Sequence, residues 1–255
     1  MDSECSLYHE LLTALVGREE LYRRELVATN AKRGASSEGE LLVIRRALNG
    51  WDGEFLISKL RDAPGRSKVV EDILRTWPFE SRCPLEWVAK YWGRTDGEYN
   101  SRRSAFWRVA LETSRGLDFK WADAEDWPSH LMWSNLYKVS PADGPNPGNR
   151  LCSAQLPACR KILDFELGTL KPDRVLMLTG YDWAYDFLAD SSFVKSHARN
   201  GKVEWSGLWT SRKSARQIPV VVCPHPQGKS EGPIVSDAVK AFRRLEGDRD
   251  AAWRG

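Results

Sequence analysis

The sequence of 255 residues predicts an α/β fold. We expect a three-layer α/β/α core around a central, mainly parallel four-stranded sheet, preceded by a helical N-terminal extension. Two observations predict this arrangement. After about residue 83, short apolar runs alternate with amphipathic helical segments, which is the pattern of layered α/β folds. Before that point, leucines recur at helical spacing. The expected regions are therefore residues 1–82 and residues 83–255.

The N-terminal region is expected to consist of helices joined by loops. The first helix is indicated by four leucines at helical spacing, Leu7, Leu11, Leu12 and Leu15. Leu21 and Leu26 continue the helical spacing, and this run is expected to end near residues 32–34. A loop rich in Gly and Ser follows at residues 34–39, and further helices are expected over about residues 40–48 and 68–77. No motif in this region carries obvious chemistry.

The second region begins with a predicted strand over residues 85–92. Ser104 is a suitable cap for the helix that follows, which Gly116 would close. A second strand is expected over residues 131–136.

A helix with Pro157 near its first turn is expected next, ending before Pro172. The third strand, residues 173–179, is almost entirely apolar and should therefore lie at the centre of the sheet. The fourth strand, residues 218–223, leads into Pro224-His225-Pro226. Pro233 then opens the last helix.

Composition restricts the function only partly. The net charge of +3 does not identify a partner, but residues 195–229 contain seven Lys and Arg and a single acid, Glu204. Such a stretch suits a phosphate backbone, and equally a solvated surface. The five cysteines form no C-x-x-C pair, and no apolar run is long enough to span a bilayer. We therefore expect a soluble, cytoplasmic protein with no disulfide framework. As a separate expectation, the protein is a monomer.

In an open parallel sheet, ligands bind beyond the carboxyl ends of the strands. The loops that follow the first, second and fourth predicted strands contain polar residues of the types used in catalysis and binding. They are Asp96, Glu98 and Asn100, then Asn135 and Lys138, and finally His225. Residues far apart in the sequence are thus expected to line one crevice.

Three motifs in this order resemble the uracil-DNA glycosylase superfamily. They are the segment 133–138 at the end of the second strand, Asn149-Arg150 in a Pro-rich loop, and His225-Pro226 after the fourth strand. The resemblance covers about residues 85–245 and implies an enzyme that flips a base out of DNA and cleaves its glycosidic bond. It implies that Asn135 reads the base and that His225 donates to the oxygen of the departing base. The alternatives are a turn-forming Asn and a His that stiffens a loop.

The loop after the first predicted strand departs from the family pattern. It reads Gly93-Arg94-Thr95-Asp96-Gly97-Glu98-Tyr99-Asn100, and only Gly97-Glu98 resembles one of the family's forms. Glu98 is the first candidate for positioning the attacking water, followed by Asp96 and Asn100, because a carboxylate can also stabilise an oxocarbenium-like sugar. Asn100 and Tyr99 are also candidates for contact with the base. The alternative is an acidic, solvated turn.

The resemblance further implies contacts with DNA. Lys138 is expected to support the loop or to bind a phosphate. The other candidates are Asn149, Arg150, Gln227, Lys229 and Ser230, with the last three in a loop that would fill the gap left by the flipped base.

No metal or other cofactor is expected. One branch of the superfamily holds an iron-sulfur cluster with four cysteines, and Cys159 matches one ligand position. However, Val139 stands where another cysteine would be, and the chain lacks an early C-x-x-C pair. The motifs of zinc deaminases, H-x-E and P-C-x-x-C, are absent as well.

The sequence therefore predicts a monofunctional DNA glycosylase. A modified pyrimidine of bacteriophage DNA is slightly favoured as its substrate over uracil, because the loop 93–100 does not reproduce the motif whose aromatic residue excludes substituted pyrimidines in relatives strict for uracil. The alternative is that Tyr99 restores this barrier. This specificity would serve anti-phage defence. The alternatives are an inactive protein that binds single-stranded or damaged DNA and a hydrolase of free nucleosides or nucleotides.

Overall fold

The computed structural model describes residues 3–21, 23–48, 53–75, 82–96, 99–212, 214 and 216–252. The chain forms two compact units, and each combines segments from both sides of residue 82. Unit 1 comprises residues 1–31, 46–80 and 135–169. Unit 2 comprises residues 32–45, 81–134 and 170–255.

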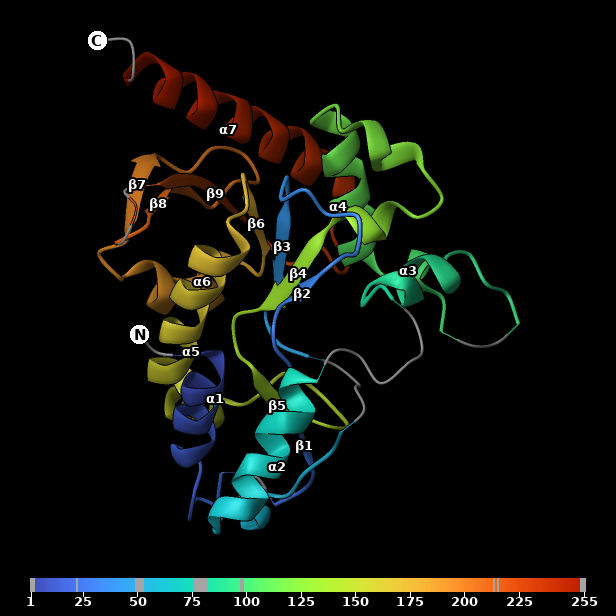
Figure 1. Cartoon of the computed structure of the whole chain (residues 1–255). Coiled ribbons are helices and arrows are strands. Elements are labelled where there is room, and N and C mark those ends of the chain that lie inside the picture. Colours follow the sequence, from blue (N-terminus) through green and yellow to red (C-terminus); the bar gives the residue numbers. More distant parts are fainter. Residues whose placement is uncertain are drawn as a thin grey trace. The chain divides into compact units, whose positions relative to one another are not determined.

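Unit 2 is built on a mixed sheet of seven strands in the order β2-β4-β3-β6-β9-β8-β7 (Figure 1). Its centre is the parallel set β3 (Leu42–Arg45), β6 (Val175–Leu178) and β9 (Gln217–Cys223). Val43, Leu176 and Val221 stand side by side across these strands and are fully buried. Strands that are apolar on both faces need cover on both faces, so this trio forms the core of the sheet.

The outer strands complete the sheet with antiparallel pairs. At one side β8 (Trp205–Thr210) joins β9, and β7 (Phe193–His197) joins β8. At the other side β2 (Lys32–Arg33) pairs with β4 (Met132–Asn135).

The helices of unit 2 include α3 (Glu86–Lys90), α4 (Ala105–Gly116), α6 (Tyr181–Leu188) and α7 (Glu231–Ala252). Short 3-10 turns lie at η2 (Ser101–Arg103), η3 (Lys120–Asp123) and η4 (Trp127–His130). Helices α4 and α7 pack together, and Arg108 of α4 donates from Nε and Nη2 to the two carboxylate oxygens of Glu231.

Unit 1 combines α1 (Glu4–Thr13), η1 (Ile57–Leu60), α2 (Ala63–Leu74) and α5 (Asn149–Leu170) with a two-stranded antiparallel ribbon. The ribbon pairs β1 (Leu26–Ala28) with β5 (Val139–Pro141), so that Ala28 lies opposite Val139. Ser3 and Asp62 cap α1 and α2 by accepting backbone N–H groups three residues ahead.

Several predictions for individual elements are confirmed. The strands expected over residues 131–136, 173–179 and 218–223 are β4, β6 and β9. The β6 strand is central in the sheet, as its apolar composition predicted. Helix α4 begins after Ser104 and ends at Gly116.

Three predicted elements are wrong. The helical run expected to end near residues 32–34 instead contains the strands β1 and β2, which form long-range pairs with β5 and β4 that local spacing does not reveal. Residues 42–45 form β3 and not a helix. The prediction failed because the apolar run Leu41 to Ile44 is too short for periodicity to distinguish a buried strand from a helix. Residues 86–90 form α3 and not a strand. Leu85 and Val88, three positions apart, are both fully buried there, which is helical spacing.

Other elements differ in extent or were not predicted. Helix α5 begins at Asn149, so Pro157 lies inside it and not in its first turn. Helix α2 occupies residues 63–74, and residues 76 and 77 of the expected helix lie outside the described residues. Elements β5, β7, β8 and α6 were not predicted. The strands among them have three to six residues, in which alternation is hard to recognise.

A glycine at the β7–β8 pair offers a test of this packing. A Cβ atom on Gly207 would lie 2.2 Å from the carbonyl oxygen of Val194 and 2.7 Å from the Trp205 ring. We expect Gly207→Ala to lower the free energy of unfolding by about 1–3 kcal/mol, as overpacking does. Gly168→Ala in α5 is the control, because open space surrounds that position and alanine favours a helix by about 0.5–1 kcal/mol. Urea denaturation measures both, and equal effects would contradict the packing.

Candidate functional site

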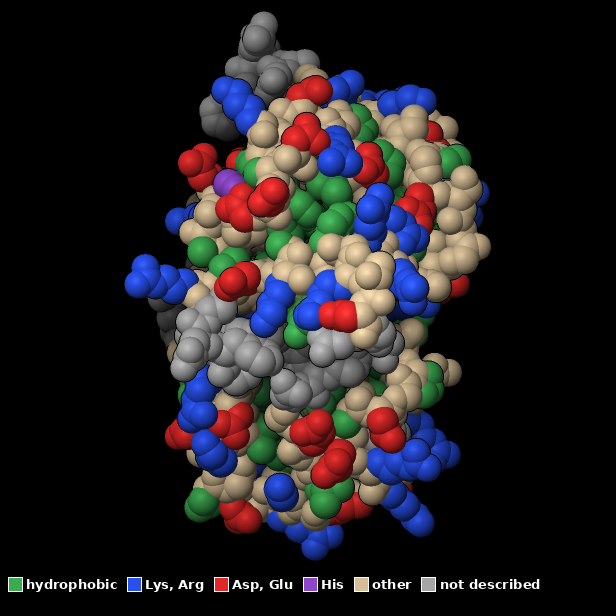
Figure 2. Space-filling view, turned by 90° about the vertical axis from the view of Figure 1, so that its right-hand side faces the viewer, with side chains coloured by type: hydrophobic (Ala, Val, Ile, Leu, Met, Phe, Trp, Pro, Cys, Tyr) green, Lys and Arg blue, Asp and Glu red, His purple; other side chains and the backbone are tan. Residues whose placement is uncertain are grey.

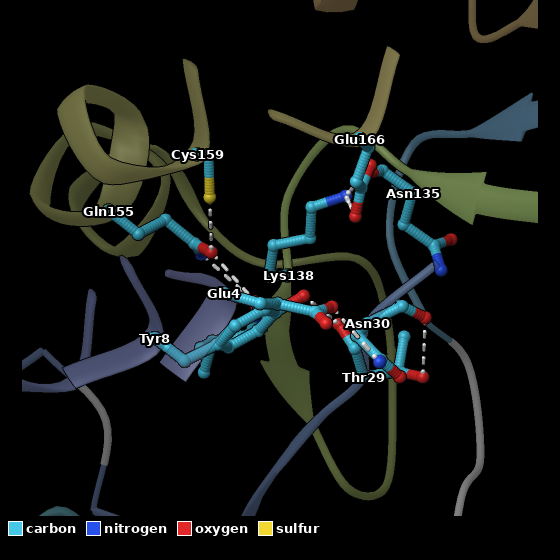
Figure 3. A network of polar contacts seen from close by, with 10 residues as sticks. Glu4, Tyr8, Thr29, Asn30, Asn135, Lys138, Gln155, Cys159 and Glu166 are labelled. Atoms are coloured by element: carbon cyan, nitrogen blue, oxygen red, sulfur yellow. Dashed lines mark hydrogen bonds and ion pairs between the residues drawn. The ribbon is translucent and has the colours of Figure 1, made fainter. Parts of the chain in front are cut away.

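In unit 1 a buried ion pair holds the segment after β4. The Lys138 ammonium donates to both carboxylate oxygens of Glu166 at 2.8 Å and to the backbone carbonyl of Asn135 at 2.6 Å (Figure 3). An ammonium group has three protons, and these three contacts use all of them. Lys138 and Glu166 are almost completely buried. Lys138 thus supports the loop, the first of its two expected roles, and its ammonium offers no exposed surface to a phosphate.

Gln155 fixes the next residue of the same segment. Its side-chain amide donates to the carbonyl of Val139 and accepts from the N–H of Val139, both at 2.9 Å. The side-chain amide of Gln155, which lies on α5, thereby makes the two hydrogen bonds that a neighbouring strand would make to Val139. Cys159 lies one turn further along α5, and its thiol contacts the Gln155 side-chain oxygen at 3.4 Å. Burial raises the pKa of the Cys159 thiol to about 12, so this thiol is protonated and can donate.

The N-terminal segment supports the opposite side of the ribbon. The Tyr8 hydroxyl of α1 donates to the carbonyl of Thr29 at 3.0 Å, and the N–H of Thr29 donates to the carbonyl of Lys138 at 3.2 Å. The side-chain amide of Asn30 donates to the Glu4 carboxylate. Burial, with the carboxylates of Glu166 and Glu4, raises the pKa of the Tyr8 hydroxyl, so this group remains a donor.

Asn135 is the last residue of β4 and is fully buried. Its backbone carbonyl is held by Lys138, and its carboxamide points away from the carboxylate of Glu166 in Figure 3. A buried carboxamide can both donate to and accept from the edge of a pyrimidine. The contacts around Asn135 thus fix the backbone from which this group extends.

In unit 2 His225 follows directly after β9, between Pro224 and Pro226. The ring is half-buried, and its Nδ1 atom accepts the backbone N–H of Gln227 at 3.3 Å. A neutral imidazole that accepts at Nδ1 carries its proton at Nε2. In the neutral imidazole, this bond to Nδ1 leaves Nε2 as the hydrogen-bond donor.

The loop after His225 is a tight, exposed turn. The N–H of Lys229 donates to the carbonyl of Pro226 at 3.0 Å, and Gly228 adopts a positive φ of 70°. Gln227, Lys229 and Ser230 are all exposed on this turn. They are thus accessible to a ligand.

The expected water-positioning residues are placed by a loop that follows α3. Asp96 is exposed and forms an ion pair with Arg94 at 2.5 Å. The Asn100 amide accepts from the N–H groups of Gly93 and Arg102 and donates to the carbonyl of Arg94, so it serves the loop itself. Tyr99 is 52% exposed. Glu98 lies outside the described residues.

Asn149 and Arg150 are exposed at the beginning of α5 in unit 1. Their exposure makes them available to a partner molecule.

Within the described ranges, no three His, Cys, Asp or Glu side chains gather in a group that could hold a metal ion. The five cysteines are free thiols. None of the helices in the described part of the chain is both long and apolar enough to cross a membrane.

Sequence reasoning missed Arg45, which lies at the carboxyl end of β3 in the parallel core of unit 2. Residue 45 was assigned to the helix expected over residues 40–48, and this helix is wrong. Recognising residues 42–45 as a strand would have placed Arg45 where ligands bind in such sheets. The supporting roles of Tyr8 and Gln155 were also missed, because each depends on contacts between distant residues.

No family model matches the chain, and no curated protein matches it in sequence.

The Lys138–Glu166 pair should be essential for the stability of unit 1. Glu166→Leu leaves a buried ammonium without its carboxylate, so we expect a loss of about 3–5 kcal/mol in the free energy of unfolding. The double variant Lys138→Met/Glu166→Leu should recover much of that loss, because it removes both charges together.

The control for this cycle is Glu10→Gln, which breaks the exposed ion pair with Lys161 in the same unit and should cost less than about 1 kcal/mol. Denaturant unfolding measures all of these variants. If the double variant were no more stable than Glu166→Leu alone, the assigned pairing would be wrong.

Proposed function

We propose that this protein is a monofunctional DNA glycosylase, which hydrolyses the N-glycosidic bond of a non-standard pyrimidine flipped out of DNA. The observation that carries the proposal is the bonding of His225, whose Nδ1 accepts the N–H of Gln227 and whose Nε2 is therefore a donor. A base that departs as an anion is stabilised by such a preorganised donor. The resemblance of segment 133–138, Asn149-Arg150 and His225-Pro226 to the uracil-DNA glycosylase superfamily supports the same conclusion.

The proposed reaction divides the charge between base and sugar. The bond between C1′ and the base nitrogen breaks, and its electron pair leaves with the base, so that negative charge develops on a base oxygen. His225 would donate a hydrogen bond to that oxygen, and Asn135 would hold the edge of the base. Water then adds to the oxocarbenium-like C1′ and transfers a proton to a carboxylate, for which Asp96 and Glu98 are the candidates.

The environment of Lys138 supports water rather than an amine as the nucleophile. A lyase would form a Schiff base with a lysine amine. The Lys138 ammonium is buried and uses its three protons on Glu166 and Asn135. This arrangement leaves no reactive amine at that position.

The strand directions support the expected parallel four-stranded block. Met132 N–H donates to the carbonyl of Leu41, and Tyr137 N–H donates to the carbonyl of Arg46, so β4 runs in the same direction as β3. Together with the parallel pairs β3–β6 and β6–β9, these two bonds support a block of four neighbouring strands with one direction. In this proposal β3 takes the place that we expected for residues 85–92, and helices cover both faces of the block.

We favour a modified pyrimidine of bacteriophage DNA over uracil as the substrate. In relatives strict for uracil, an aromatic residue of the first motif excludes substituents at the pyrimidine C5 atom, and the loop 93–100 does not reproduce that motif. Release of such bases would create abasic sites in phage DNA within the cytoplasm and spare unmodified host DNA. Competition between substrates tests this specificity: rapid release of uracil with none from modified phage DNA would overturn the defence role.

The catalytic roles are tested by substitution. We expect His225→Ala and Asn135→Ala to remain folded and to lower the single-turnover rate of base release by about a hundredfold or more, because each removes a preorganised group. His9→Ala on α1 is a control that should leave the rate unchanged. Abasic sites are detected by alkaline cleavage of the product strand. Wild-type turnover by His225→Ala would show that the site is assigned wrongly.

The exposed turn after His225 is proposed to fill the space of the flipped base. Replacing Gln227 and Lys229 together by alanine should therefore reduce activity on duplex DNA more than on single strands, since only the duplex has a stack to be filled. The ratio of kcat/KM values on the two substrates measures this effect. Equal losses on both would count against insertion of the turn.

The same assays separate the alternative functions. Binding of DNA without abasic sites would support a protein that binds single-stranded or damaged DNA. Activity confined to free nucleosides or nucleotides would support a small-molecule hydrolase.

A further inference from the structure

Arg45 is a half-buried cation that lacks an anionic partner in the described part of the chain. It ends β3, and its guanidinium carbon lies 5.2 Å from the centroid of the Phe106 ring. None of the carboxylates within the described ranges forms an ion pair with it. Burial lowers the pKa of Arg45, and an electrostatic interaction with Tyr99 acts in the opposite direction. A partly desolvated guanidinium of this kind binds an anion strongly, because little further desolvation is required.

Tyr99 presents an exposed aromatic ring close to this cation. Its centroid lies 5.9 Å from that of Trp87 and 6.4 Å from that of Tyr91, both on or beside α3. Trp87 in turn contacts the rings of Trp107 and Trp133 at 5.7 and 6.5 Å, and these two are buried in the core. Tyr99 is therefore the exposed end of an aromatic cluster anchored in the core.

The two residues that follow Tyr99 are bonded to α3 and to the segment directly after it. Ser101 donates its hydroxyl to the carbonyl of Val88 at 2.6 Å and its N–H to the carbonyl of Tyr91 at 3.1 Å. Asn100 binds three backbone groups, those of Gly93, Arg94 and Arg102. These bonds hold the Tyr99 backbone in place before any ligand arrives, which reduces the entropy lost on binding.

Further cations surround the aromatic cluster. Lys90 and Arg94 lie 5.8 and 5.2 Å from the centroid of Tyr91, and Arg102 and Arg103 are exposed in η2. Figure 2 looks onto the side of the molecule that carries α3 and shows Lys and Arg side chains across the middle of that face. An exposed aromatic ring among cations is the combination that proteins use to hold single-stranded nucleic acid.

We propose that Arg45 and Tyr99 form a subsite for one nucleotide of single-stranded DNA, distinct from the nucleotide whose base is cleaved. The Tyr99 ring stacks on the base, and the Arg45 guanidinium binds a phosphate of the strand. Arg102 and Arg103 continue the contact along the backbone. Since any base offers a flat π face, this subsite binds without sequence preference. The inference goes beyond the proposed function, because a protein that binds single strands without cleaving them would use the same subsite.

The stacking contact is tested with an unmodified, fluorescently labelled oligothymidylate, which contains no base for a glycosylase to release. Tyr99→Ala should weaken binding roughly five- to a hundredfold, while Tyr99→Phe should bind within about twofold of the wild type, because the ring is kept. The matched control is Tyr185→Ala, since Tyr185 is 56% exposed on α6 of the same unit. Equal affinities of Tyr99→Ala and Tyr185→Ala would overturn the stacking role.

The phosphate contact is tested by the dependence of affinity on salt. Arg45→Gln should reduce the slope of log K against log salt concentration by about 0.7, the value for one phosphate contact on a single strand. Arg45→Lys keeps the charge and should keep the slope, and Tyr99→Ala should also keep it. Arg243→Gln, at an exposed arginine on α7 of the same unit, is the control and should leave the slope unchanged. Circular dichroism establishes that each variant is folded.

The result that would overturn the phosphate contact is an unchanged slope for folded Arg45→Gln. These binding measurements are independent of base release. Loss of oligothymidylate binding in Tyr99→Ala and Arg45→Gln would support the subsite even if the wild-type protein released no base. Conversely, wild-type binding by both variants would overturn the subsite and leave the proposed glycosylase activity intact.

Discussion

The need to satisfy three protons on one buried ammonium determines the structure around Asn135. Lys138 has no access to solvent, so each of its protons must meet an acceptor inside the protein. Two meet Glu166 on α5, and the third meets the backbone carbonyl of Asn135. This fixes the distance between α5 and the end of β4. An apolar pair could be as stable, but it would not orient a carbonyl group.

The rest of unit 1 depends on the position that this ion pair imposes. Once Lys138 is fixed, Val139 can bind both ends of the Gln155 amide, and β5 can pair with β1. The pairing brings Thr29 within reach of Tyr8 on α1. Helices far apart in the sequence thus converge on one short segment. The N-terminal region, which contains no recognisable motif, thus supports the segment that contains Asn135.

The predictable parts of the fold are those in which local pattern and tertiary environment agree. The runs that became β6 and β9 are apolar throughout, bounded by prolines or polar residues, and buried on both faces. Residues 40–48 and 85–92 were predicted wrongly for the opposite reason. Four consecutive apolar residues fit a strand or a helix equally well, and only the neighbouring strands decide between them. The edge strands are too short to show a period at all.

The residues of the candidate site likewise divide into those that the sequence predicts and those that it does not. Asn135 and His225 could be identified from motifs, because the residues that flank them are consecutive in the sequence. Arg45 and Gln155 could not, since their roles arise from partners more than ten residues away: Phe106 for Arg45 and Val139 for Gln155. The ion pair of Asp96 with Arg94 and the loop contacts of Asn100 likewise depend on backbone geometry that residue types alone do not reveal.

His225 and Tyr99 are preorganised by the same physical means. Each is a functional group next to a backbone bond that the chain makes to itself: Gln227 N–H binds the His225 ring, and the Asn100 amide binds three backbone groups beside Tyr99. Proline on both sides of His225 restricts the chain further, because φ is fixed at each proline and the residue before a proline is confined to extended conformations. Local bonds of this kind form during folding, so the entropy lost in ordering these groups does not weaken the free energy of ligand binding. Such bonds allow a surface loop to present a hydrogen-bond donor or an aromatic ring in a defined position.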